Sequence, residues 1–165
     1  MEHCYKTFIS IGNGLQSFSR LLNAVESLNH LLPKPVIVQA GHTHFVSKDN
    51  QVVDFVSMDD FIRYVNDAQL LILHAGAGSI MNAIKAGKCP IVMPRMLKYK
   101  EVINDHQVSL AKMMHAEGRV IMTETEEELE IAIKRVLSDN FVSSTKTNSK
   151  ASLVIKNKLD EFLNE

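Results

Sequence analysis

The sequence has few of the features that mark several common classes of protein. It has no tryptophan and two cysteines, Cys4 and Cys89, which form no CxxC pair, so we expect free thiols in a reducing compartment. Its 18 basic and 19 acidic residues nearly cancel, which argues against nucleic acid as the main partner. The chain is therefore expected to be an ordinary globular protein.

Membrane-spanning and metal-binding patterns are also missing. No basic segment followed by an apolar stretch opens the sequence, and the longest apolar run, residues 70–73, is far too short to cross a bilayer. We expect a cytoplasmic protein that meets a membrane only peripherally, through a partner. His42, His44 and His115 form no ligand set at metal spacing, so we expect surface histidines and no metal site.

The length of 165 residues suits one domain. We expect an α/β domain over residues 1–137, a polar linker rich in Ser, Thr and Asn over 138–150, and an amphipathic helix over 151–165 that packs on the same domain.

Short apolar runs alternate with stretches of helical spacing, a pattern typical of a doubly wound, Rossmann-like parallel sheet of about six strands. In the first helix, apolar residues recur every three to four positions, which predicts one buried face made of Leu21, Leu22, Val25, Leu28 and Leu32. In the helix over 57–66, the residues expected to face inward are Phe61, Ile62 and Val65. The expected strands are residues 5–11, 36–39, 52–56, 70–73, 90–93 and 119–122, and the expected helices run from near Gln16 to Pro33 and over 57–66, 79–86, 105–117 and 126–137.

The segment HAGAGS, residues 74–79, follows the fourth expected strand and opens a helix. Glycines there allow a ligand to approach the backbone, and the first-turn amides of Gly78 to Ile80 with the helix dipole favour a diphosphate. His74 and Ser79 could donate further hydrogen bonds. The simpler interpretation is a tight turn with Ser79 as helix cap. The spacing matches neither a Walker A motif nor GxGxxG, so we favour another diphosphate ligand.

Two polar stretches beyond this segment allow simpler interpretations. Arg95, Lys98 and Lys100 are expected to form a solvated basic loop, with partner or phosphate contact as the alternative. Asp105 is expected to cap the following helix.

The block HAGAGSIMNAIKAGKCPIVMPR, with NDHQ and AKMMHAEG after it, resembles the C-terminal, donor-binding domain of family 28 glycosyltransferases. It is especially similar to small stand-alone catalytic subunits that work with a membrane-associated partner, in N-glycan assembly or in bacterial exopolysaccharide or capsule synthesis. The resemblance implies one half-domain of the GT-B fold. It also implies a UDP-sugar as donor substrate, no cofactor, and inverting transfer without a metal.

The resemblance also implies roles for individual residues. The residues expected to bind the diphosphate are Gly76, Gly78 and Ser79, with His74 beside it. The residues expected to contact the donor sugar are Gln107 and His106. The residues expected at the mouth of the cleft are Gly12 and Asn13. Many relatives have a carboxylate at the position of Asn82 that accepts hydrogen bonds from the ribose. Asn82 brings no charge to that role.

The resemblance therefore implies a catalytic subunit that moves a hexose-type sugar from a UDP-sugar to a lipid-linked saccharide. No residue of this sequence is clearly placed as the general base. We expect a membrane-associated partner to recognise the acceptor. A non-catalytic nucleotide-sugar-binding module is the main alternative, and a sugar-nucleotide epimerase of related fold is another.

Overall fold

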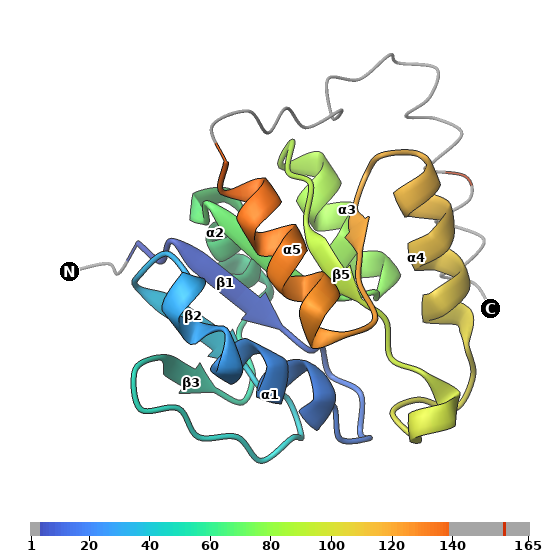
Figure 1. The fold of residues 1–165 in the computed structure, drawn as a ribbon, viewed down its shortest axis with the longest axis horizontal. Coiled ribbons are helices and arrows are strands. Elements are labelled where there is room, and N and C mark those ends of the chain that lie inside the picture. The colour runs from blue at the N-terminus through green and yellow to red at the C-terminus, as the bar shows by residue number, and fades with distance from the viewer. Residues whose placement is uncertain (1–3, 139–156, 158–165) are drawn as a thin grey trace.

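The computed structural model describes residues 4–138 and residue 157, which contain one parallel β-sheet with helices on both faces (Figure 1). The sheet has six strands in the order β3-β2-β1-β4-β5-β6, and all five pairings are parallel. This confirms the predicted doubly wound architecture. The strands are β1 (Thr7–Ser10), β2 (Val36–Gln39), β3 (Gln51–Val53), β4 (Leu70–His74), β5 (Ile91–Met93) and β6 (Ile121–Met122).

Helices follow the strands in the expected alternation. Apart from residues 138 and 157, the predicted linker (138–150) and final helix (151–165) lie outside the described residues. The α-helices are α1 (Ser19–Ser27), α2 (Met58–Asp67), α3 (Ala77–Lys85), α4 (His106–Ala116) and α5 (Glu126–Val136), and the 3-10 helices are η1 (Asn29–Leu31) and η2 (Leu97–Tyr99).

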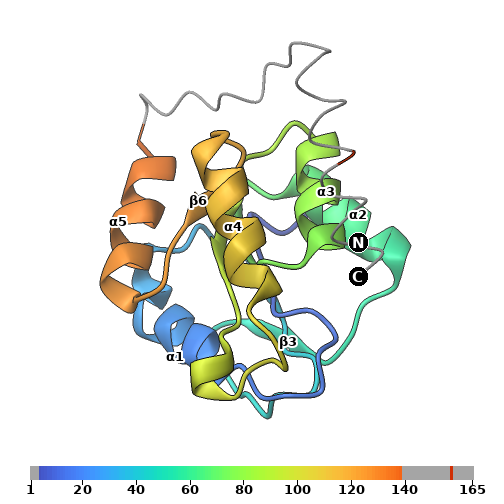
Figure 2. The same cartoon turned by 90° about the vertical axis from the view of Figure 1, so that its right-hand side faces the viewer.

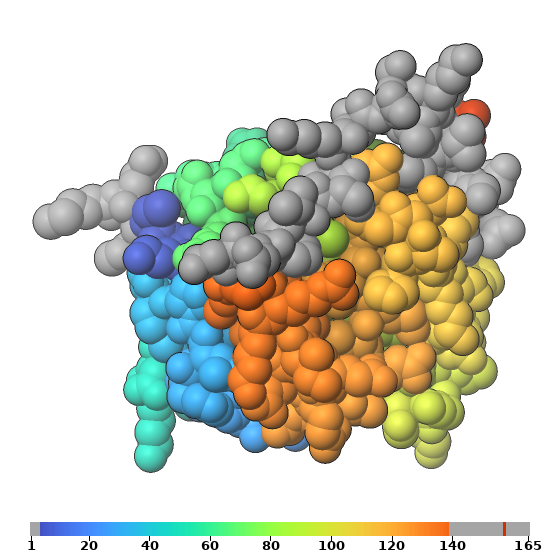
Figure 3. Space-filling model, turned by 45° about the horizontal axis from the view of Figure 1, so that its top comes forward, coloured from blue at the N-terminus to red at the C-terminus, as the bar shows by residue number. Residues whose placement is uncertain are grey.

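The sheet separates two apolar cores. Helices α1 and α5 cover one face, while α2, α3 and α4 cover the other (Figure 2). In the space-filling view, the blue N-terminal segments lie directly beside orange α5, in agreement with the packing of α1 against α5 (Figure 3). The residues predicted to form the buried face of the first helix are indeed buried: Leu21, Leu22, Val25, Leu28 and Leu32.

Three local predictions need correction. Ile62, expected to face inward from α2, is 41% exposed, because Phe61 and Val65 fill the buried stripe of this short helix. The third strand ends at Val53, and the chain then turns so that Val56 lines a cavity. Helix α3 begins at Ala77, two residues before the predicted start.

The strand order places a change of direction between β1 and β4. The chain leaves β1 toward α1 on one face and leaves β4 toward α3 on the other, so the loops after these neighbouring strands diverge. Ligands of doubly wound sheets bind in the crevice that such divergence opens at the carboxyl ends of the strands. A ligand is therefore expected to bind between the loops that begin at Ile11 and Ala75.

Candidate functional site

A cavity of about 280 Å³ opens at the carboxyl ends of β1 and β4. It combines the loop after β1, the end of β2, the start of α2 and the turn into α3. Its lining residues are Ser10, Gly12, Asn13, Gln39, Val56, Ser57, Met58, Phe61, His74, Gly76, Gly78, Ser79 and Asn82. The structure therefore brings together most of the predicted site residues, and we call this space the donor cavity, after the donor substrate that the resemblance implies.

Two glycines make room for the imidazole of His74. A Cβ atom on Gly12 would lie 2.5 Å from Nε2 of His74, and a Cβ on Gly76 would overlap the same ring. Gly12 also has a φ of +73°, which a residue with a side chain adopts at a cost. These glycines therefore serve the packing of His74 as well as the approach of a ligand.

The His74 ring is uncharged at neutral pH. Burial, and next the positive charge of Arg95, lower the pKa of His74 from 6.5 to about 4. A neutral imidazole carries one N–H group, so the ring can donate one hydrogen bond and accept one. His74 can therefore contact a phosphoryl oxygen as a neutral donor, without forming an ion pair.

The first turn of α3 lines the donor cavity through Gly78 and Ser79. Gly76 is the N-cap residue and makes no side-chain cap hydrogen bond, so the simpler interpretation of Ser79 as a cap is wrong. The amide of Ile80 donates to the carbonyl of Gly76 at 3.0 Å, which removes it from the predicted set of free donors. The amides of Ala77, Gly78 and Ser79 belong to the first turn of α3, where no carbonyl of the helix can accept their hydrogen bonds. A Cβ on Gly78 would meet nothing within 4 Å.

Polar side chains from two strands form a network on the opposite wall. Ser10 Oγ donates to Gln39 Oε1 at 2.8 Å, and Gln39 Nε2 donates to Asn13 Oδ1 at 3.0 Å. The amide of Gly12 donates to Ser10 Oγ at 3.3 Å. Because Asn13 already accepts through Oδ1, its NH₂ group is the part that can donate to a ligand.

The remaining wall is apolar, and the cavity has little charge. Val56, Met58 and Phe61 come from the start of α2, where Ser57 caps the helix by accepting from the amide of Asp60 at 3.1 Å. Among the described residues that line the cavity, none is Asp, Glu, Lys or Arg. An anion bound here would be near the first-turn amides of α3, with apolar side chains nearby that a planar base could contact.

A second cavity of about 290 Å³ adjoins the first, and Gly76 lines both. His106 and Gln107, at the start of α4, line this second space together with Asn104. The predicted sugar-contacting pair thus lies next to the donor cavity. Gln107 Oε1 accepts from the amide of Arg95 at 3.1 Å, which leaves its NH₂ group to donate.

Two predictions about polar residues near this second cavity are wrong. Asp105 occupies the N-cap position of α4 but makes no cap hydrogen bond, because its Oδ1 accepts from the amide of Leu97 at 2.8 Å. Arg95, expected on a solvated loop, is 2% exposed because backbone carbonyls surround its guanidinium, whereas Lys98 and Lys100 are exposed as expected.

Ser10, Gln39 and Arg95 were missed as site residues. Each stands at or just past the carboxyl end of a buried strand, where a polar residue interrupts an apolar run. A polar residue at the end of an apolar run could have indicated a site residue, since ligands bind at the carboxyl ends of the strands in a parallel sheet. His42, His44 and His115 are exposed, as predicted. No group of His, Cys, Asp and Glu suited to a metal ion occurs in residues 4–138, and no helix within that range is long and apolar enough to cross a membrane.

Comparison with known proteins gives one family and several relatives. Residues 8–163 match the glycosyltransferase family 28 C-terminal domain. The UDP-N-acetylglucosamine transferase subunit ALG13 of Mus musculus is 29% identical over 128 residues, and that of Homo sapiens is 31% identical over 104. These alignments cover 70% and 60% of this chain but 10% and 8% of the relatives, so the chain spans a small part of their length.

Solved structures show the same fold at low sequence identity. An NMR structure of ALG13 has a TM-score of 0.60 and 18% identity, with 91% of this chain and 93% of that chain covered. MurG of Acinetobacter baumannii has a TM-score of 0.59 and 15% identity over 98% of this chain and 50% of MurG. The glycotransferase of kitacinnamycin has a TM-score of 0.66 and 17% identity, with 94% and 39% covered.

Proposed function

The chain belongs to the glycosyltransferase family 28 C-terminal domains, and from this premise we propose that it is the donor-binding, catalytic subunit of a two-component UDP-sugar transferase. We further propose that it moves a hexose-type sugar to a lipid-linked saccharide in exopolysaccharide or capsule synthesis, with inversion and without a metal. The relatives named as UDP-N-acetylglucosamine transferase subunits make UDP-N-acetylglucosamine the first donor to test.

The observation that carries the proposal is the uncapped start of α3 inside the donor cavity. Amides of the first helical turn and the helix dipole attract a diphosphate, and the neutral His74 ring lies beside them. We place the base against the apolar wall of Val56 and Met58, the ribose near Asn82, and the sugar toward Gln107 and His106.

The same groups would stabilise the departing nucleotide. When the bond between the sugar C1 and the diphosphate oxygen breaks, negative charge grows on that oxygen while the acceptor oxygen bonds to C1. Fixed amide donors stabilise this charge more in the transition state than in the ground state. Catalysis by this chain would therefore consist mainly of leaving-group stabilisation by α3.

The acceptor hydroxyl must also lose its proton. Among the described residues that line the donor cavity there is no carboxylate, and His74, with a pKa of about 4, is a weak base at neutral pH. We therefore propose that a membrane-associated partner supplies the base and holds the acceptor.

Donor binding is tested by titration calorimetry of the chain with UDP-N-acetylglucosamine, UDP-glucose, UDP-galactose and UDP-glucuronate. We expect one of these to bind at least about tenfold more tightly than the others, since a buried polar group left without its hydrogen bond by the wrong sugar costs about 1–3 kcal/mol. GDP-mannose, which differs from these donors in both base and sugar, serves as the non-cognate control. Equal affinity for all five nucleotides would contradict the proposed donor site.

Catalysis is tested by transfer of radiolabelled sugar, with the chain alone, with membranes from source cells lacking it, and with both. We expect transfer to lipid only in the combined reaction. Transfer by the chain alone would contradict the need for a partner. Donor binding without transfer in the combined reaction would favour the non-catalytic binding module, for which the lack of a base in the cavity is the supporting observation.

A further inference from the structure

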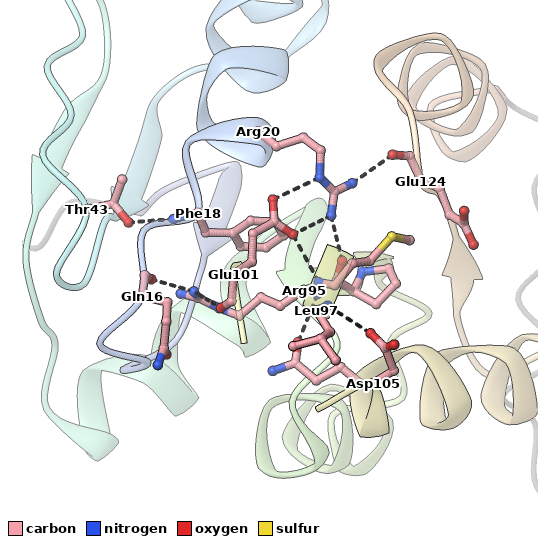
Figure 4. Close-up of polar contacts among 12 residues, drawn as sticks. Gln16, Phe18, Arg20, Thr43, Arg95, Leu97, Glu101, Asp105 and Glu124 are labelled. Carbon is pink, nitrogen blue, oxygen red and sulfur yellow. Dashed lines mark hydrogen bonds and ion pairs between the residues drawn. The ribbon is translucent and has the colours of Figure 1, made fainter. Parts of the chain in front are cut away.

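Arg95 is a buried cation at the end of β5 whose hydrogen bonds reach two separate loops (Figure 4). Its Nη2 donates to the carbonyl of Ile11 at 2.9 Å, and its Nη1 donates to the carbonyl of Gln16 at 2.6 Å. These two carbonyls bracket the loop that carries Gly12 and Asn13. The guanidinium also stacks on Phe18, 4.8 Å from the ring centre.

The same residue is fixed to the loop on its other side. Nη1 donates to the carbonyl of Glu101 at 3.0 Å, and the backbone amide of Arg95 donates to Gln107 Oε1 at 3.1 Å. Arg95 therefore joins the loop that lines the donor cavity to the side chain that lines the second cavity.

The planar guanidinium explains why arginine stands here. Nη1 and Nη2 of one rigid, planar guanidinium donate to three backbone carbonyls. The ammonium of a lysine, on its flexible side chain, does not reproduce this arrangement. The loop also packs closely on the guanidinium of Arg95, because a Cβ on Gly14 would lie 3.3 Å from the guanidinium carbon. The cation sits beneath the loop in close contact with its backbone.

We propose that Arg95 is a positioning residue that sets the spacing between the two parts of the donor site, Gly12 and Asn13 on one side and Gln107 on the other. This inference rests on the proposed function, because it assigns Arg95 a role in that site. Arg95 does not line either cavity and acts through the groups it holds. Its charge also reaches the donor cavity, since it is one of the causes of the lowered pKa of His74.

A neighbouring arginine provides a matched control. Arg20 Nε and Nη2 donate to the carboxylate of Glu101 at 3.0 and 2.8 Å, and its other hydrogen bonds go to the carbonyls of Pro94 and Glu124. Its guanidinium also lies over the rings of Phe18 and Tyr99, 5.3 and 4.9 Å from their centres. Arg20 belongs to the same polar cluster in Figure 4 and shares Glu101 with Arg95, but its hydrogen bonds reach neither residues 11–16 nor Gln107. Loss of Arg20 is therefore expected to lower stability without changing the site.

The experiment measures dissociation constants for UDP and UDP-N-acetylglucosamine by calorimetry, and melting temperatures, for the wild type, R95K, R95M and R20K. We expect R95K and R95M to weaken UDP-N-acetylglucosamine at least about tenfold, at a temperature where each variant is folded, because a misplaced loop loses hydrogen bonds to the ligand. R20K should melt earlier than the wild type and keep both dissociation constants within about twofold.

Each outcome bears on a different claim. If R95K binds as the wild type does, the positioning role is overturned while the proposed function stands, because both proteins then bind the donor. If R20K loses affinity as strongly as R95K, the cluster is merely structural and the role is also overturned. If the wild type binds neither UDP nor UDP-N-acetylglucosamine, both the proposed function and this inference fail.

Discussion

At the scale of single residues, the glycines of the donor cavity differ in purpose. Gly12 and Gly76 make room for the His74 ring, whereas Gly78 borders open space in the cavity. Substitution should therefore separate folding from binding. A side chain at Gly12 disturbs the protein itself, and a side chain at Gly78 disturbs only what enters the cavity.

We predict that Gly78→Ala raises the free energy of unfolding by about 0.5–1 kcal/mol, because alanine is a better helix former than glycine, and weakens UDP binding. Gly78→Val should weaken the binding of UDP further.

Gly12→Ala should instead lower the free energy of unfolding by at least about 2 kcal/mol, because position 12 has a positive φ and the added Cβ would overlap the His74 ring. Urea unfolding and calorimetry measure both effects, and full UDP affinity in Gly78→Val would contradict the site.

His74 should make stability depend on pH. Its pKa is about 4 in the folded chain and 6.5 when unperturbed, so between these values the unfolded chain binds a proton that the folded chain does not. The free energy of unfolding therefore falls as the pH drops through this range, by about 2 kcal/mol from pH 7 to pH 5 for this residue alone.

His74→Gln removes this titration and leaves the other histidines in place. We predict that the wild type loses about 2 kcal/mol more than His74→Gln between pH 7 and pH 5 in urea unfolding. Equal losses in the two proteins would show that His74 is not buried as a neutral ring.

At the scale of elements, two helices begin with side-chain caps but differ in their distance from the site. Ser57 caps α2 beside the donor cavity, and Thr125 caps α5 on the other face by accepting from the amide of Glu128 at 3.2 Å. The start of α3, by contrast, has no side-chain cap. Helices α1 and α4 also begin without such a cap, so it is the position of the α3 start in the wall of the donor cavity that suits a ligand.

We predict that Ser57→Ala and Thr125→Ala each lower the free energy of unfolding by about 1 kcal/mol, the usual value of a cap. Only Ser57→Ala should also weaken UDP binding, because a frayed α2 start moves Val56 and Met58 in the cavity wall. Urea unfolding and UDP titration of both variants test this pair. Weaker binding in Thr125→Ala would count against the assigned site.

At the scale of the whole molecule, the donor cavity joins the two halves of the sheet. Its walls come from β1 and β2 on one side and from β4 and α3 on the other. A ligand that binds here should stabilise the whole fold by mass action, by about 2.7 kcal/mol at a concentration of 100 times its dissociation constant.

We predict that saturating UDP slows amide hydrogen exchange in both 11–16 and 75–80, two segments separated in sequence but adjacent across the site. Residues 41–50, which lie outside the cavity, serve as the internal control. Protection of only one of the two segments would show that the nucleotide does not lie between the halves of the sheet.

Much of this architecture could be predicted from the sequence, because apolar runs and helical spacing report which faces must be buried. The run at 36–39 matches β2 to the residue, and the buried face of α1 follows from the spacing of its leucines. HAGAGS could be identified as the turn that opens α3 beside a cavity, and its binding of a diphosphate stays a prediction. These are local properties, which neighbouring residues decide.

The sequence by itself therefore determined the element order, the sheet class and the turn proposed to bind the ligand. Only the tertiary structure decided that Gly12 and Gly76 enclose the His74 ring, that Ser10 and Gln39 orient Asn13, and that Arg95 is buried. Burial of a charge depends on the carbonyls that surround it, and those at Ile11 and Gln16 are about eighty residues away along the chain. Such contacts between distant segments arise only when the sheet brings the ends of its strands to one edge.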